Sequence, residues 1–105
     1  MSTTKPEPPS SYREFIARYP KLGEAWEALR AAESDGPLDD KTMRLVKLGV
    51  AIGAQHVGAV HSAVRKAVAA GVSRDEIEQA IALAATTIGL PSTVAANNWV
   101  REQLE

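Results

Sequence analysis

The apolar residues of this chain recur at steps of three and four, in segments that glycine and proline separate. This spacing places them on one face of a helix, whereas a half-buried strand needs alternation with a period of two. Nothing in the 105 residues shows sustained alternation. The sequence therefore predicts an all-α fold of about six helices, approximately over residues 12–18, 21–32, 39–53, 55–70, 74–88 and 92–103.

The strongest local signal is the segment Ser73–Glu76, which has the capping-box pattern of a helix N-terminus. In such a box the serine hydroxyl accepts a hydrogen bond from the glutamate amide, and the glutamate side chain accepts one from the serine amide. Gly71 should end the preceding helix with a positive φ angle. We expect the helix at 39–53 to be central and buried, because apolar residues cover much of its circumference.

The beginning of the chain differs in composition from the rest. Its first ten residues contain three of the six prolines and almost nothing that a core could bury. We therefore expect residues 1–10 to be a flexible tail and residues 11–105 to be a single domain. The hydrophobic fraction is 45% but aromatic residues make up only 5%, so most apolar side chains are small. A monomer of this kind would bury little apolar area, which predicts a homo-oligomer.

Charge and cysteine content narrow the classes of function. The net charge of −1 provides no basic surface for phosphates, so we expect no nucleic acid partner. The absence of cysteine excludes disulfides, thiolate chemistry and sulfur ligands for metals. No apolar run is long enough to span a membrane, and the first residues contain no apolar signal segment. We expect a soluble cytoplasmic protein without membrane association.

Three motifs in this helical frame carry a family resemblance. Residues 38–42 (Leu-Asp-Asp-Lys-Thr) open the third predicted helix, residues 71–77 contain the capping box, and residues 87–91 read Thr-Ile-Gly-Leu-Pro. Together they resemble the carboxymuconolactone decarboxylase family, which includes the alkylhydroperoxidase D-like proteins, over residues 38–99. The resemblance implies an all-helical fold and assembly into trimers or hexamers with sites near subunit contacts.

The peroxidase branch of this family carries a glutamate early in the central helix and then a Cys-x-x-Cys-x-x-x-His motif. With the first two motifs kept in register, the glutamate position falls at Arg44. The cysteine positions fall at His56 and Ala59, and the histidine position falls at Ala63. Disulfide cycling needs an attacking thiolate and a resolving thiol, and this chain has neither. Thiol peroxidase activity is therefore excluded, and the resemblance is to a branch that lacks the cysteine pair.

His56 and His61 are then the candidates for proton transfer, because histidine titrates near neutral pH. They lie five residues apart, about 140° around a helix, so we expect no metal bound by both. His56 would share a helical face with Ala59 and Ala63, whose small side chains leave room for a pocket. Residues 58–62 also resemble small family members that read Gly-Ala-Val-His-Ser, in which His61 is the branch's own histidine. A structural role for either histidine is the competing interpretation.

Arg65 and Arg44 are the candidate anion-binding residues, although arginines on amphipathic helices usually belong to a solvated face. Arg65 lies four residues after His61, so the two side chains can meet one anion. Gly49 and Gly53 are expected to permit close helix contacts.

Two functional hypotheses follow. In the first, the protein binds or transforms a small carboxylate or lactone-type molecule, with His56 or His61 moving the proton and Arg65 or Arg44 holding the anion. In the second, it is a non-catalytic oligomer with a binding or scaffold role. The sequence leaves open whether the protein is an enzyme, and an enzyme would be a decarboxylase-like lyase. We expect neither a metal nor a cofactor.

Overall fold

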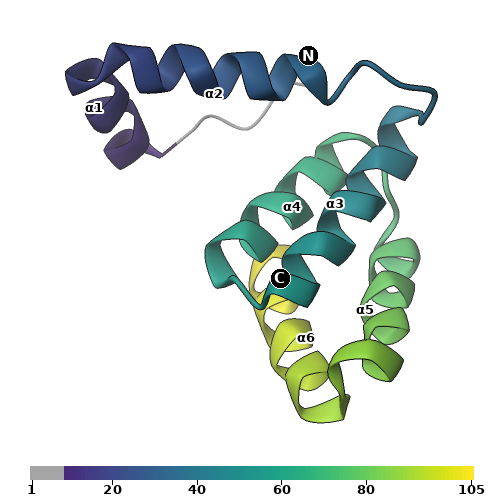
Figure 1. Cartoon of the computed structure of the whole chain (residues 1–105). Coiled ribbons are helices and arrows are strands. Elements are labelled where there is room, and N and C mark those ends of the chain that lie inside the picture. The colour runs from purple at the N-terminus through teal and green to yellow at the C-terminus, as the bar shows by residue number, and fades with distance from the viewer. Residues whose placement is uncertain (1–8) are drawn as a thin grey trace. The chain divides into compact units, whose positions relative to one another are not determined.

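The structure is a computed structural model that describes residues 9–105 (Figure 1). In this part of the chain the helices are α1 (Ser10–Arg18), α2 (Pro20–Ala32), α3 (Asp40–Ala54), α4 (Val57–Ala69), α5 (Arg74–Ile88) and α6 (Leu90–Leu104). The described residues contain no strand, which confirms the all-α prediction for them. Of the predicted tail, residues 1–8 lie outside the described residues, and Ser10 already begins α1.

Two compact units make up the described chain, one that ends at Leu38 and one that spans Asp39–Glu105. This division falls inside the single domain predicted for residues 11–105. The first unit is the hairpin of α1 and α2, which pack against each other and bury no residue. Gly23 lets the two helices approach closely, because a Cβ built there would lie 3.3 Å from Cβ of Ile16.

The second unit is a ring of four helices, which we call the core unit. In it α3 packs against α4 and α5, and α6 packs against the same two helices (Figure 1). The buried residues of this ring are aliphatic apart from Thr93: Leu48, Ala51, Ile52, Val60, Val64, Ala67, Val72, Ile77, Ile81, Ala96 and Val100. The Thr93 hydroxyl donates a 2.8 Å hydrogen bond to the Gly89 carbonyl, so the one buried polar side chain among the described residues is satisfied.

The helix ends of the core unit follow the sequence signals. Asp39 caps α3, and its carboxylate accepts a 2.8 Å hydrogen bond from the Thr42 amide. Ser73 Oγ accepts from the Glu76 amide at 3.1 Å, and Glu76 Oε1 accepts from the Ser73 amide at 2.8 Å. Both halves of the predicted capping box are therefore confirmed. Gly71 has a φ angle of 90°, which confirms the positive value predicted for it.

The prediction that α3 is buried all round is wrong. Leu48 and Ile52 are fully buried, whereas Val46 is 51% exposed and Val50 is 68% exposed. Helices α4 and α5 cover one side of α3, and within the core unit the side that carries the two valines stays open. In the described part of the chain, none of the helices has the length and hydropathy needed to cross a membrane.

Candidate functional site at the α4 and α6 surface

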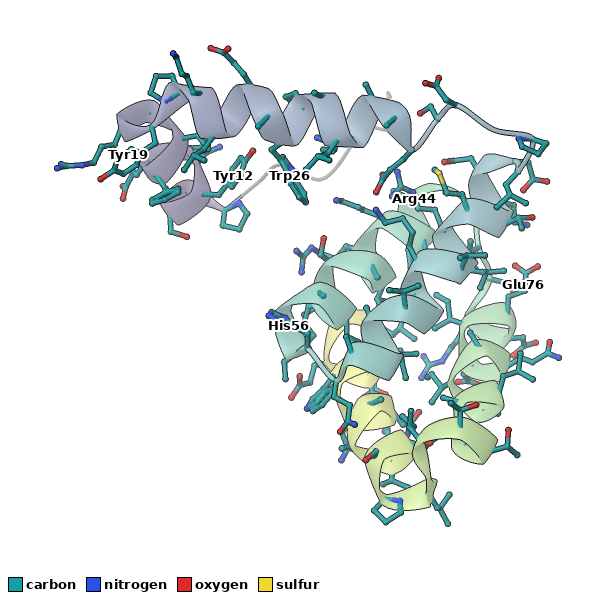
Figure 2. The ribbon with its side chains drawn as sticks, viewed as in Figure 1. Tyr12, Tyr19, Trp26, Arg44, His56 and Glu76 are labelled. Atoms are coloured by element: carbon teal, nitrogen blue, oxygen red, sulfur yellow. The ribbon has the colours of Figure 1, made fainter. Side chains whose placement is uncertain are left out.

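His56 lies at the N-cap of α4 rather than inside a helix (Figure 2). Gln55 ends α3 in the left-handed conformation with φ 54°, and α4 begins at Val57. The His56 Nδ1 accepts a 3.3 Å hydrogen bond from the Ala59 amide, which satisfies one of the free amides at the helix start. The prediction that His56 shares a helical face with Ala59 and Ala63 is therefore wrong. In this structure its ring caps a helix.

His61 and Arg65 lie one turn apart on α4, and both reach α6. The Nε2 atom of His61 lies 2.8 Å from Oε1 of Glu102. The Nη1 atom of Arg65 donates a 3.2 Å hydrogen bond to Oε1 of Gln103. The imidazole and the guanidinium therefore stand side by side on one surface of the core unit, which we call the α4–α6 surface.

Arg44 belongs to a different part of the core unit. Its Nε lies 3.7 Å from Oδ1 of Asp40 one turn earlier on α3, and its side chain is 18% exposed. It lies near the start of α3, while His56 follows the other end of that helix (Figure 2). At 1.5 Å per residue, Arg44 is about 15 Å along the helix axis from Ala54. Each of these two predicted site residues has a local partner of its own.

Glu102 and Gln103 were missed by the sequence reasoning. They lie in the last turn of α6, 41 and 38 residues along the chain from their partners on α4. The four-residue spacing of His61 and Arg65 shows that the two share a face of α4. No local pattern reveals which turn of which helix packs against that face, so the two partners could not be found from the sequence.

A concave feature, which we call the α3–α5 groove, lies between those two helices. It is open and has a volume of about 570 Å³, within the range of small-molecule pockets. Its lining is mostly apolar and consists of Leu45, Val46, Gly49, Gly53, Glu76, Gln79, Ala80, Leu83, Ala84, Thr87 and Ile88. None of these lining residues is a histidine or an arginine, so the groove contains none of the predicted site residues.

Glu76 is the charged residue in the lining of the groove. The hydrogen bond from the Ser73 amide is the largest factor holding the pKa of Glu76 below its usual range. The Lys41 ammonium, whose Nζ is 3.6 Å from Glu76 Oε1, lowers this pKa further. The carboxylate therefore stays ionised at neutral pH, and a bound anion would meet a negative charge at this end of the groove.

Gly49 and Gly53 have a different role from the close helix contacts predicted for them. A Cβ built at Gly49 or Gly53 would meet no atom within 4 Å, apart from its chain neighbours and the backbone of its own helix. The predicted close helix contacts are therefore absent at these positions, and the glycines line open space. Small residues also occur one turn apart at Ala80 and Ala84 on α5. This repeat on both helices is a sequence signal that could have indicated the groove.

The described residues, 9–105, contain no group of three or more His, Cys, Asp and Glu side chains that could hold a metal ion. The polar groups at the α4–α6 surface are an imidazole, a guanidinium, a carboxylate and an amide. They can hold an anion and move a proton.

Comparison with known proteins gives one match. The model of the carboxymuconolactone decarboxylase family matches residues 20–102, from the first turn of α2 to the last turn of α6. No curated protein and no solved structure matches the chain. The family match includes all three motifs that carry the resemblance, and it includes His61 and Arg65.

Proposed function

The chain belongs to the carboxymuconolactone decarboxylase family, and from this membership we propose that it binds or transforms a small carboxylate or lactone-type molecule. In this proposal His61 moves the proton and Arg65 holds the anion. The observation that carries the proposal is their placement together, because both side chains lie on one face of α4 and bond neighbouring residues of α6.

The chemistry of the two groups fits such a ligand. A guanidinium binds a carboxylate through parallel N–H donors, and Arg65 uses one of its nitrogens on Gln103. Because Gln103 is a neutral amide, that bond orients Arg65 without cancelling its charge. Loss of carbon dioxide from a carboxylate leaves an electron pair on carbon, which must take up a proton. Histidine can deliver that proton near neutral pH.

Thiol chemistry has no part in this function. These 105 residues contain no cysteine, so the chain has neither an attacking thiolate nor a resolving thiol. A family member without these groups must use other side chains or have no catalytic role.

The experiment uses carboxymuconolactone, the compound for which the family is named. Turnover is measured as carbon dioxide release, and binding is measured by calorimetry. His61→Ala should lower turnover by a factor on the order of a hundred or more, because a general acid contributes about that much. Arg65→Gln should weaken binding by removing the cationic donor. The matched control is His56→Asn, which changes the other histidine but keeps a side chain able to cap α4.

Two results would overturn this proposal. Carboxymuconolactone that neither binds nor reacts would contradict the ligand class. Unchanged binding and turnover in the His61→Ala variant would contradict the assignment of the α4–α6 surface, even if the wild-type protein is active.

A non-catalytic oligomer is the second candidate function, and the α3–α5 groove is the observation that favours it. We propose that the chain forms a trimer or hexamer and that a second copy covers this groove. The lining is mostly apolar, and Val46 and Leu83 are 51% and 68% exposed in the single chain. Exposed apolar surface of this kind is typical of protein interfaces.

A matched pair of variants tests the assembly by analytical ultracentrifugation. Val46→Asp places a charge in the groove, whereas Val94→Asp places one on α6 at a valine with the same exposed fraction of 51%. The oligomer should dissociate in the first variant and persist in the second. A monomeric wild-type protein, or an oligomer that survives Val46→Asp, would contradict the proposed interface.

A further inference from the structure

Two side-chain hydrogen bonds join α4 to α6. Residues one turn apart on α4, His61 and Arg65, bond consecutive residues on α6, Glu102 and Gln103. The two hydrogen bonds, of 2.8 and 3.2 Å, therefore fix the same register between the helices. Within this pairing the histidine faces a carboxylate and the arginine faces a neutral amide.

Helix stability does not account for a carboxylate at Glu102. This residue lies in the last turn of α6, where the negative end of the helix dipole disfavours an anion. Glu105, also at this end, is balanced by Arg101 at 2.9 Å and by Arg74 at 3.4 Å. Glu102 instead pairs with His61 on the neighbouring helix, with Oε1 2.8 Å from Nε2 of the ring.

The hydrogen bond determines which ring nitrogen of His61 carries the proton. An ionised carboxylate has no proton to donate, so the imidazole nitrogen that faces it must be the donor. In the neutral ring, Nε2 is then protonated and Nδ1 is left with its lone pair. Nδ1 becomes the atom that exchanges a proton with a ligand. In the imidazolium form Nδ1 carries the proton that the proposed reaction delivers to carbon, and the carboxylate stabilises the positive charge of that form.

We infer that Glu102 is a positioning residue, which holds Nε2–H of His61 and leaves Nδ1 as the atom that exchanges a proton with the ligand. This inference rests on the proposed function of the α4–α6 surface and adds the residue that prepares the imidazole for it. Glu102 acts through His61 and needs no contact with the ligand.

Glu102 can be substituted without a large effect on folding, because the ion pair with His61 is partly exposed. The side chain of Glu102 is 57% exposed and that of His61 is 25% exposed. Ion pairs with this exposure stabilise a fold only slightly, so the folded protein should tolerate the loss of the carboxylate. A change in the ring can therefore be separated from unfolding.

The test measures the ¹⁵N chemical shifts of both His61 ring nitrogens in the ligand-free full chain, at an alkaline pH above which these shifts no longer change, so that the ring is neutral. In the wild type, Nε2 should carry the proton. Glu102→Gln introduces an amide that both donates and accepts, so the Nδ1–H population should rise on the order of tenfold. The matched control Glu105→Gln removes the carboxylate that pairs with Arg74 and Arg101, and it should leave the His61 tautomer unchanged.

A wild-type protein with His61 mainly in the Nδ1–H form would overturn the inference. An equal tautomer population in wild type and Glu102→Gln would also overturn it. Because the measurement needs no ligand, it separates this inference from the proposed function. Failure to bind carboxymuconolactone contradicts the proposed ligand class, whereas an unchanged tautomer contradicts the role of Glu102.

Discussion

The hairpin of α1 and α2 and the core unit of α3 to α6 use similar local signals but differ in what they bury. Trp26 and Leu29 in the hairpin are 47% and 63% exposed, and neither helix of the hairpin buries a residue. In the core unit each helix has two main neighbours, and Leu48 and Ile52 are completely buried. Apolar spacing is thus enough to form a helix, whereas a core requires that several helices surround a common volume.

The largest predicted difference between the two units is in the free energy of unfolding when one leucine in each is truncated. Leu48→Ala removes a fully buried side chain and should lower the free energy of unfolding by about 2–5 kcal/mol. Leu29→Ala removes a side chain that is 63% exposed and should change it by less than about 0.5 kcal/mol. Urea denaturation of both variants checks this difference. Equal losses would show that the hairpin is buried to the same degree as the core unit.

A smaller effect should come from the helix caps. Ser73 caps α5 with its hydroxyl, so Ser73→Ala should cost about 1 kcal/mol of stability. Ser10 follows the N-cap of α1, where the structure shows no capping side chain, and Ser10→Ala should have almost no effect. Thermal unfolding of the two variants compares them. A loss as large for Ser10→Ala as for Ser73→Ala would contradict the capping assignment.

The smallest predicted effect is a loss of stability at low pH that arises from two carboxylates in the core unit. The Ser73 amide lowers the pKa of Glu76 below its usual 4.5, and the Thr42 amide lowers the pKa of Asp39 below its usual 3.8. Each carboxylate therefore stabilises the fold above its unfolded pKa, and this contribution disappears as the pH falls through the lowered folded value.

Glu76→Gln should accordingly flatten the decline of stability below about pH 4.5, while it lowers stability at neutral pH. Glu24→Gln, which removes a carboxylate from α2 in the hairpin, is the matched control. Urea denaturation between neutral pH and pH 3 provides the comparison. If the acid dependence of Glu76→Gln equals that of the wild type, the box does not hold an ionised glutamate.

Much of the fold could be predicted because its signals are local. Apolar spacing gave the helices, Asp39 and Ser73 marked two helix starts, and Gly71 marked a turn. The junction between α3 and α4 was predicted between residues 53 and 55, slightly too early in the chain. The left-handed residue there is Gln55, and glutamine carries no sequence signal for a positive φ angle.

Less of the candidate site could be predicted because its contacts join distant segments. The spacing of His61 and Arg65 correctly placed them on one face of α4. Their partners, Glu102 and Gln103, depend on how α6 packs against α4, which no short motif encodes. Assembly into a trimer or hexamer stays a prediction. The proposed interface lies on the side of α3 that the core unit leaves open.

The central claim is that ligand chemistry belongs to the α4–α6 surface of the core unit rather than to the α3–α5 groove or the hairpin. Chemical-shift mapping of the full chain during titration with carboxymuconolactone tests it most directly. We expect the largest changes at His61, Arg65 and Glu102. Changes confined to groove residues such as Val46 and Leu83, or to α1 and α2, would contradict it.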